Sequence, residues 1–546
     1  MHGFVSLHPG TLVGRGSPGL QVASVLFTKA CRRTHFFSGK RVSRSRFEHL
    51  SRDSSCEHAS FEHDRAAIFA LQDVLDRVRR ALGVAPNNRQ SPSLTKSTLG
   101  PAIKFENNAP SWDELEALVT ERATALGWEE PDHVNGPTNP YSLLRLFGTN
   151  DKPRVKLYRD HAAWCPYCHK VWLLLEEKQI PYEVEKINMR CYGPKPASFM
   201  QKVPSGLLPV LEFNGKIYTE SSVIMQLLEE SFPERPMLPQ RNTPLHARAE
   251  TLMRLERRLF SDWLQWLCYD NGYEQRKKVF EGRLNEVESA LQELGGPYFL
   301  GEAISMVDLV FVPFLERMAA SVLYYKGLRI RSGRWPALAR WFEAMESRST
   351  YRGTQSDYYT HVHDLPPQLG GCALAPEGVP FANAIDGRDD KSWAHPLDAL
   401  SSASLEAYSA GDNPGLDTFY PAYRLIQNRD NVTTFALRGC GQPGTRPVSA
   451  ALCDPSAIPK EESRPEVDSA LRHVAHALLI GYNAKQSSPE HALKKAEDGD
   501  GMDGTDVVPS LAYMRDRICV PRDLSYPQAR QLRAHLNWAI DALQEV

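Results

Sequence analysis

Two cysteines form the stretch of this 546-residue chain whose types and spacing point most directly to chemistry, in Cys165-Pro-Tyr-Cys168. An apolar run at 155–158 precedes them and predicts a strand, and the pattern from 166 to 178 predicts a helix. Cys165 would then cap that helix, with proline at the first helical position, where a missing N–H costs nothing. The free N–H groups and dipole of a helix N-terminus favour thiolate over thiol, so Cys165 is the predicted nucleophile. Cys168, one turn further on, is placed to resolve a mixed disulfide.

A cysteine pair of this spacing has two other interpretations. It can be half of a zinc site, with His161 and His169 nearby, or a buried and inert pair. No second Cys-x-x-Cys follows at zinc-ribbon spacing, so redox or thiol-transfer chemistry is favoured and no metal is predicted.

Composition limits the classes of function. The formal net charge is −2, which gives no basis for nucleic-acid or membrane-surface binding. No apolar run approaches the roughly 20 residues that a membrane span needs. The 10 cysteines are scattered without a regular framework, which fits a reducing compartment better than a secreted disulfide scaffold.

The first sixty residues differ from the rest of the chain. They are rich in Lys, Arg, Ser and Thr, and Glu48 is the only acid before Asp53. This is the composition of an organelle transit peptide, so import is predicted, with the plastid preferred over the mitochondrion. The alternative interpretation is a disordered basic tail that is not a targeting signal, in which case the protein would be cytoplasmic.

The part around the cysteines alternates between strand and helix patterns. Strands are expected at 155–158, 182–187, 210–213 and 217–218, the last two joined by the hairpin signal Asn214-Gly215, and helices at 166–178, 196–201 and 220–230. From Pro244 to Arg348 every periodic segment is helical, and Ser305-Met-Val-Asp308 forms a capping box in which Asp308 is structural. The fold expected is a small α/β unit followed by a helical bundle.

Several motifs together make this region similar to a known family. Cys165-Pro-Tyr-Cys168, Gly206-Leu-Leu-Pro209-Val-Leu211 and Glu220-Ser221 occur in the order and spacing of the thioredoxin-like domain of cytosolic-type glutathione transferases. The resemblance is to the cysteine-using classes, namely omega, lambda and dehydroascorbate reductase. It is greatest for the iota class of photosynthetic organisms, because of the residue sequence from Leu157 to Cys168. It implies a thioredoxin-like domain, an all-α transferase C-terminal domain, and glutathione as the co-substrate.

The resemblance also implies a role for individual residues in binding glutathione. Pro209 would be a cis-proline, with the backbone of Leu208 pairing with the cysteinyl part of glutathione. Glu220 and Ser221 would hold the γ-glutamyl end, and Lys195 the glycyl carboxylate. Tyr167 would flank the thiol.

Each of these residues has an ordinary structural interpretation when it is taken alone. Pro209 is a turn proline, Glu220-Ser221 a helix cap and Lys195 a surface charge. The joint pattern favours the binding role.

Domains are predicted at 1–60 (transit peptide), 61–150 (helical and linker extension), 151–240 (thioredoxin-like, glutathione-binding), 241–360 (all-helical transferase domain) and 361–546 (mostly helical, of unknown role). The N-terminal helices expected at 64–82 and 111–126 are predicted to pack against the α/β domain that follows them.

The region 365–395 is predicted to be loop-rich, helices are expected near 397–408, 467–479, 511–518 and 525–543, and a polar loop is expected at 486–504. His361, His363 and Asp364 invite a metal interpretation that no third ligand spacing supports.

Three functions are compatible with these residues. The favoured one is a glutathione-dependent thiol transferase or reductase, acting on a glutathionylated protein or a small molecule such as dehydroascorbate through a Cys165 mixed disulfide. The second is conjugation of glutathione to an electrophile, for which Tyr158 is the nearby hydroxyl. The third is a non-catalytic module that binds glutathione or another ligand. The sequence does not fix the second substrate, the use of Cys168 in turnover or the oligomeric state.

Overall fold

The computed structural model describes residues 109–189, 192–397, 405–406, 413–444, 451–480 and 504–544, all within one compact unit, Val74–Val546. The predicted transit peptide, the helix at 64–82, most of the helix at 397–408 and nearly all of the polar loop at 486–504 lie outside these residues. Within the described ranges, every helix falls short of the length and apolar character required to span a bilayer.

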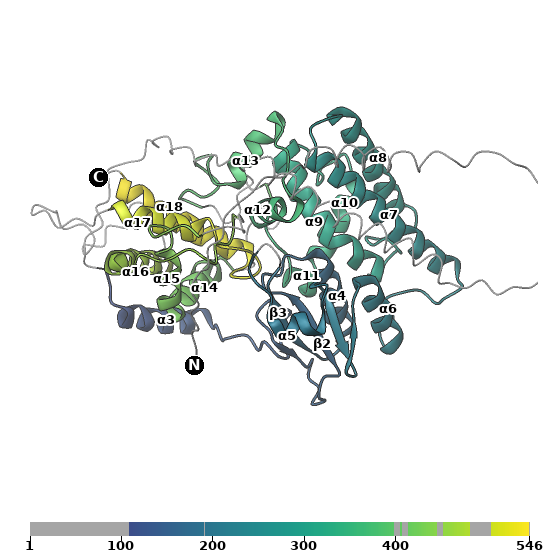
Figure 1. Cartoon of the computed structure of the whole chain (residues 1–546), viewed down its shortest axis with the longest axis horizontal. Helices are drawn as coiled ribbons and strands as arrows, with labels where there is room; N and C mark the ends of the chain where they lie inside the picture. The colour runs from purple at the N-terminus through teal and green to yellow at the C-terminus, as the bar shows by residue number, and fades with distance from the viewer. Residues whose placement is uncertain are drawn as a thin grey trace, which may run out of the picture. The chain divides into compact units, whose positions relative to one another are not determined.

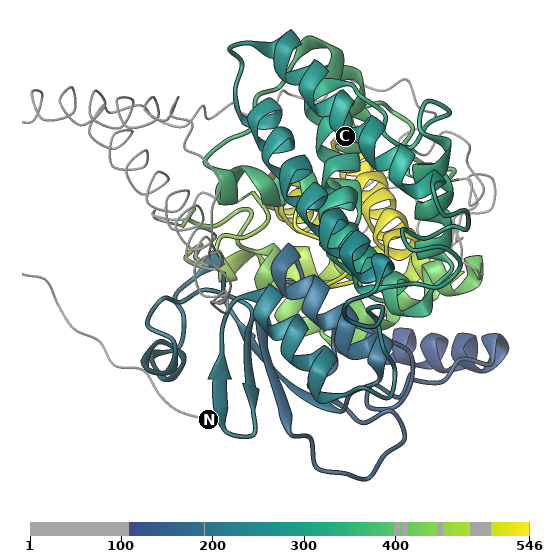
Figure 2. The ribbon, with the colours of Figure 1, turned by 90° about the vertical axis from the view of Figure 1, so that its right-hand side faces the viewer.

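A five-stranded sheet forms the α/β part, in the order β1-β3-β2-β4-β5. Its strands are β1 (Leu144–Arg145), β2 (Val155–Asp160), β3 (Tyr182–Ile187), β4 (Val210–Phe213) and β5 (Lys216–Tyr218). β2 and β3 are parallel and the other pairs are antiparallel. The β4–β5 hairpin, visible in Figure 2, turns at Asn214 and Gly215, whose φ values of 50° and 75° confirm the predicted turn signal.

Three helices belong to this sheet: α4 (Pro166–Lys178), α5 (Ala197–Lys202) and α6 (Ser221–Ser231). The sheet also includes β1, which the sequence did not predict. Arg145 of β1 donates two hydrogen bonds to Glu176 of α4, each 3.0 Å long, and both side chains are buried. The α/β part therefore begins before residue 151, the predicted boundary.

The helical bundle follows and contains α7 (Pro244–Cys268), α8 (Tyr273–Gln292), α9 (Met306–Lys326), α10 (Pro336–Glu346), α11 (Ser349–Arg352), α12 (Tyr358–Leu369) and α13 (Val379–Ile385). Every residue of α9 is buried, and α4, α7, α12 and α13 pack around it (Figure 1). Since α12 spans residue 360, the predicted boundary there falls inside a helix, and α12 and α13 replace much of the predicted loop.

The predicted capping box of α9 is confirmed. The Asp308 carboxylate accepts hydrogen bonds from the backbone and hydroxyl of Ser305 at 2.9 and 2.8 Å, and from Trp341 Nε1 at 2.8 Å. Asp308 is fully buried, so it has the structural role that the sequence indicated.

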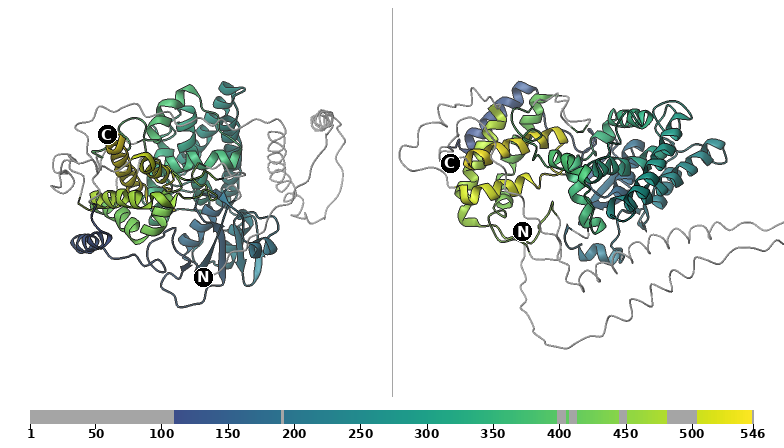
Figure 3. Two further views of the ribbon diagram at one scale, coloured as in Figure 1. Left: turned by 60° about the vertical axis from the view of Figure 1, so that its left-hand side comes forward. Right: turned by 90° about the horizontal axis from the view of Figure 1, so that it is seen from above.

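A second hydrophobic core lies in the C-terminal part. It contains α14 (Pro414–Gln427), α15 (Arg429–Ala436), α16 (Arg464–Ile480), α17 (Gly504–Arg515) and α18 (Tyr526–Gln544), together with α3 (Trp112–Leu126). Helix α3 begins with the predicted capping box of Ser111 and Glu114, but it packs on α14 and α16. The right-hand view of Figure 3 shows it beside helices of the C-terminal part. The prediction that this helix packs against the α/β domain is therefore wrong, because its apolar face matches helices that lie 300 residues later in the chain.

A buried ion pair joins the two cores. Arg533 of α18 donates to Asp357 Oδ2 at 2.6 Å and to the carbonyl of Ile518 at 2.8 Å, and Asp357 also caps α12 through Thr360 N. Neither charged side chain is exposed. Since each charge depends on the other, loss of one partner leaves an uncompensated buried charge.

We expect Arg533→Met to lower the free energy of unfolding by about 3 kcal/mol, because Asp357 would lose its buried partner. Urea denaturation followed by tryptophan fluorescence measures the change. The matched control is Arg429→Met, which breaks a surface pair with Glu116 between α15 and α3 and should cost less than about 1 kcal/mol. Equal effects of the two substitutions would contradict the structural role of the buried pair.

Candidate functional site

Cys165 lies at the N-cap of α4, and proline follows it in the first turn. Its sulfur accepts a hydrogen bond from the backbone N–H of Cys168 at 3.4 Å. The side chain is 8 % exposed, whereas Cys168 is 1 % exposed. Burial, together with the neighbouring Cys165 sulfur, raises the pKa of the Cys168 thiol well above its ordinary value. The two sulfurs therefore differ in exposure and in environment, and Cys165 is the one that caps the helix.

Asp160, at the end of β2, completes a small buried cluster with the two cysteines. One ligand atom from each of the three residues lies within 4.8 Å of the other two. Asp160 Oδ2 accepts from the backbone N–H of Trp164 at 2.6 Å, and Oδ1 has no hydrogen-bond partner among the described residues. The carboxylate holds the turn that leads into Cys165 and lies close to both thiols. Asp160 was not among the predicted site residues, although its place at the end of a strand before the motif is visible in the sequence.

Strand register brings the predicted glutathione-binding residues toward Cys165. Tyr158 pairs with Val210 and Leu211 pairs with Tyr218. The end of β2, the start of β4 and the end of β5 therefore lie side by side, at the same end of the strands. The end of β3 lies there too, because Asp160 pairs with Ile187 in parallel. The segments that continue from these strand ends carry the cysteine motif, Leu208-Pro209, Glu220-Ser221 and Lys195.

The Leu208–Pro209 peptide bond is cis, which confirms that part of the prediction. Leu208 is half-buried and packs against the same hydrophobic cluster as Cys165 and Tyr167. The side chain of Lys195 runs past Gly206, and its ammonium donates to the carbonyl of Asn188.

Glu220 and Ser221 lie at the start of α6. Glu220 has φ 65° and ψ 112°, an uncommon backbone conformation for a residue with a Cβ, and its side chain does not cap the helix. Ser221, the first residue of α6, is buried. A helix start at this edge offers backbone N–H groups to an anionic ligand.

Tyr167 points toward the helical bundle. Its ring packs edge-on against Phe314 of α9, with centroids 5.4 Å apart, and the ammonium of Lys170 lies 5.4 Å from the ring centroid. Tyr167 therefore lies next to the thiol in sequence and lines the junction with α9.

The turn before Cys165 is also held from the helical parts of the chain. Arg317 of α9 donates to the carbonyl of Trp164, and the Arg522 guanidinium lies 5.4 Å from the Trp164 ring centroid. Leu452 and Cys519 of the C-terminal part belong to the same hydrophobic cluster as Cys165. Sequence reasoning missed these contacts, since only the fold brings residues 317 and 522 to position 164.

The three residues with a possible metal pattern after α11 face different partners. His361 Nε2 lies 3.2 Å from Glu316, His363 Nε2 lies 2.8 Å from Asp386, and Asp364 accepts from Tyr192 at 2.8 Å. Among the described residues these three side chains do not converge on one point, as a metal site would require.

Comparison with known proteins places the two central domains in one family. The model described as glutathione S-transferase, N-terminal domain, matches residues 164–231, and the corresponding C-terminal domain model matches residues 249–344.

Two curated relatives and one solved structure illustrate the likeness. Glutathione S-transferase DHAR3, chloroplastic, of Arabidopsis thaliana is 28 % identical over 38 % of this chain and 75 % of its own length. Glutathione S-transferase omega-1 of Sus scrofa is 29 % identical over 29 % of this chain and 65 % of its own. The crystal structure of glutathione transferase Omega 3C from Trametes versicolor is 26 % identical and covers 39 % of this chain and 93 % of that one, with a TM-score of 0.34. Residues 164–231 and 249–344 therefore match the N- and C-terminal domains of glutathione S-transferases, and the curated relatives that the chain resembles include DHAR and omega proteins of that family.

Proposed function

We propose that this chain catalyses glutathione-dependent thiol transfer or reduction through the thiolate of Cys165. The observation that carries the proposal is the position of Cys165 at the N-cap of α4, on the sheet edge where the predicted glutathione-binding segments meet. The relatives named glutathione S-transferase DHAR3 and DHAR2 fit the dehydroascorbate reductase class that the sequence resembles, and they support reduction as the type of reaction. A cysteine in this place favours disulfide chemistry because a helix N-terminus stabilises its thiolate.

The reaction balances as two thiol–disulfide exchanges. The Cys165 thiolate attacks the glutathione sulfur of a glutathionylated substrate, the substrate thiolate leaves, and Cys165 becomes a mixed disulfide with glutathione. The thiolate of a second glutathione then attacks the glutathione sulfur of that disulfide, which releases glutathione disulfide and restores the Cys165 thiolate. With dehydroascorbate, two glutathione molecules supply the same two electrons and become glutathione disulfide.

Binding of glutathione would use groups that its chemistry requires. The Glu220 carboxylate suits the ammonium of the γ-glutamyl end, and Ser221 with the α6 N-terminus suits its carboxylate. Lys195 would meet the glycyl carboxylate, and the Leu208 backbone would pair with the cysteinyl unit, beside Tyr167.

Conjugation to an electrophile is the weaker candidate. It would need a hydroxyl donor at the glutathione sulfur, and Tyr158 was the hydroxyl considered for that role. The Tyr158 hydroxyl donates to Glu212 at 2.8 Å and accepts from Lys202 at 2.8 Å. Both interactions hold the hydroxyl between β4 and α5, so no observation favours conjugation.

We also propose import into the plastid. The basic, acid-poor composition of residues 1–60 supports it, and the Arabidopsis thaliana relative DHAR3 is named chloroplastic. Expression of the full chain with a C-terminal fluorescent tag tests this, and uniform cytoplasmic fluorescence would contradict import.

We expect Cys165→Ser to lower thiol transfer to a glutathionylated peptide by at least about 100-fold, because a serine hydroxyl cannot form the mixed disulfide. The release of glutathione disulfide, coupled to glutathione reductase, measures the rate. Conjugation to 1-chloro-2,4-dinitrobenzene, measured in parallel, should stay weak or rise. Cys440→Ser, a half-buried cysteine of the C-terminal part, is the control and should leave the rate unchanged. Full transfer activity in Cys165→Ser would overturn the proposal.

Alkylation by iodoacetamide should modify Cys165 before Cys168 between pH 7 and pH 9. Burial raises the pKa of Cys168, so its thiol stays protonated to a higher pH and its reactive thiolate fraction is smaller. Peptide mass mapping at successive times gives both rates, and the unfolded chain in urea, in which the two cysteines should react alike, is the control. Equal rates in the folded protein at pH 7 would refute the unequal roles of the two thiols.

Glu220→Gln and Ser221→Ala should each raise the KM for glutathione by about tenfold, because each removes one polar contact worth about 1.4 kcal/mol. Initial rates at varied glutathione concentration provide the values. Glu234→Gln, an exposed residue after α6, serves as the matched control. An unchanged KM in both site variants would contradict the glutathione-binding role of these two residues. It would not affect the role of Cys165, which the Cys165→Ser variant tests separately.

A further inference from the structure

A second pair of thiols lies outside the cysteine motif. Cys268 is the last residue of α7, and Cys372 follows Gly370 and Gly371, just after α12. Both cysteines are free thiols, and both are half-buried against the main hydrophobic core. Helices α8 to α12 separate them in the chain, so no local spacing pairs them.

A backbone contact brings these two cysteines together. The N–H of Ala373 donates to the carbonyl of Leu267 at 3.0 Å, so a neighbour of one cysteine is hydrogen-bonded to a neighbour of the other. The side chain of Cys268 is a hydrogen-bonding partner of the Cys372 thiol. Thiols in such contact lie at the short range that a disulfide requires, so a small movement is sufficient to join them.

A buried ammonium lies beside the pair. The N–H of Ala375 donates to the carbonyl of Tyr325 at 2.8 Å, which holds the segment after Cys372 against the end of α9, where Lys326 is the last residue. Lys326 is 2 % exposed, and its Nζ has no hydrogen-bond partner among the described residues. Its positive charge favours the thiolate of Cys372. A buried cation without a hydrogen bond, next to two thiols, indicates that a thiolate is the group it stabilises.

The two thiols differ in the charges around them. Cys268 ends α7, and the carbonyl end of a helix disfavours a thiolate. Burial, followed by the neighbouring Cys268 thiol, raises the pKa of Cys372 well above its ordinary value, whereas Lys326 acts in the opposite direction. The other titratable groups that face the thiols or Lys326 are Asp270, Tyr273, Tyr325 and Glu377. Cys372 is therefore the better nucleophile, and the pair reacts faster as the pH rises.

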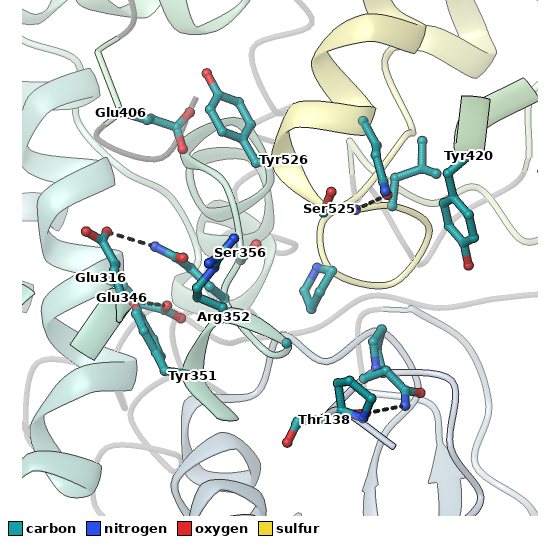
Figure 4. Close-up of a pocket in the computed structure, with 18 of the residues that line it drawn as sticks. Thr138, Glu316, Glu346, Tyr351, Arg352, Ser356, Glu406, Tyr420, Ser525 and Tyr526 are labelled. Atoms are coloured by element: carbon teal, nitrogen blue, oxygen red, sulfur yellow. Dashed lines mark hydrogen bonds between the residues drawn. The ribbon is translucent and has the colours of Figure 1, made fainter. Parts of the chain in front are cut away.

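The pair lies close to the outer surface of the bundle. Tyr269, which follows Cys268, and Leu374, close to Cys372, are both 42 % exposed. The cavity of about 350 Å³ that Figure 4 shows is lined by neither cysteine. A dissolved oxidant therefore reaches the two thiols from solvent and not through that cavity.

We propose that Cys268 and Cys372 are a second redox site, which glutathione disulfide converts to an intramolecular disulfide. The Cys372 thiolate attacks one sulfur of glutathione disulfide, whose S–S bond breaks, and one glutathione leaves as the thiolate. Cys268 loses its proton to solvent and attacks the Cys372 sulfur, which releases the second glutathione. The two protein thiols give up two electrons, and one glutathione disulfide becomes two glutathione molecules.

The product joins the end of α7 to the segment that leads to α13. It closes a loop of roughly 100 residues, and a cross-link of that length restricts the unfolded chain strongly. The site uses neither Cys165 nor Cys168, so it does not depend on the proposed thiol transfer.

Disulfide mapping of the full chain tests the proposal. The reduced protein is incubated with glutathione disulfide at about pH 8.5, where more of the thiol is ionised, and is then blocked with N-ethylmaleimide. Trypsin cleaves between the two cysteines, so digestion without reduction should give their two peptides joined by a disulfide. Cys440→Ser, in the other hydrophobic core, is the control and should give the same product. Free thiols at both positions, or glutathione adducts that never resolve, would overturn the proposal.

Removal of one thiol identifies the order of attack. Cys268→Ser should accumulate a glutathione adduct on Cys372, because the resolving thiol is absent. Cys372→Ser should form an adduct on Cys268 more slowly. The same peptide mapping gives both rates, and faster modification of Cys268 than of Cys372 would contradict the assigned nucleophile.

Lys326 is a positioning residue for this pair, and its effect should appear in the pH profile. Lys326→Met should shift the pH dependence of the oxidation rate to higher pH, because the Cys372 thiolate loses its cation. Lys326→Arg should restore a profile close to that of the unchanged protein. Lys278→Met, at an exposed position of α8, is the control. An unchanged profile in Lys326→Met would refute the role of this ammonium, whereas the mapping of the unchanged chain decides whether the disulfide forms.

Discussion

The pairing register of the central strands is the constraint on which the thiol site depends. β4 runs antiparallel to β2 and to β5, while β3 runs parallel to β2. The last residues of β2, β3 and β5 and the first residue of β4 therefore lie together at one end of the strands. A slip of one residue in the β2–β4 pairing would turn side chains to the opposite face of the sheet and move Pro209 along the edge. The backbone hydrogen bonds between the strands therefore determine where the loops attached to these strand ends lie.

Helix α9 extends that constraint into the rest of the molecule. Arg317 holds the Trp164 carbonyl beside Cys165, and its neighbour Glu316 lies 3.5 Å from His169 on α4 and 3.2 Å from His361 on the other side. One helix thus contacts both the turn before the thiol motif and helix α12. Glu316 and Arg317 are adjacent charged residues in a largely apolar helix, and their side chains reach α4, α12 and the turn before Cys165.

Much of the α/β part could be predicted from the sequence because its signals are local. The strand at 182–187 and the helix at 166–178 have the expected bounds, since apolar periodicity and a proline in the first turn mark them. Strand β1 was missed because two residues carry no periodicity and a side-chain pair with Glu176 stabilises it. Helix α12 was missed because it contains Pro366 and Pro367, which indicate a helix break when they are considered alone.

The candidate site was predictable to the extent that its motifs follow one another in the chain. The cysteine pair was predicted from its spacing and its place before a helix, whereas the cis-proline and the start of α6 were predicted from the resemblance to the transferase family. Arg317 and Arg522 were not, because they reach Trp164 through long-range packing that no local pattern encodes. Asp160 was missed although its contact with Trp164, four residues later, is local.

The packing of α3 on α14 and α16 makes the second core a discontinuous domain, with the glutathione S-transferase domains inserted between its first helix and the others. Trp112 donates to Asp468, a residue 356 positions further along the chain. During synthesis the transferase domains can fold as soon as they emerge from the ribosome, whereas α3 has to wait for nearly all of the remaining chain before its apolar face is covered. The core that contains α3 therefore cannot be completed until the C-terminal helices have been synthesised, although α3 precedes the inserted domains in the chain.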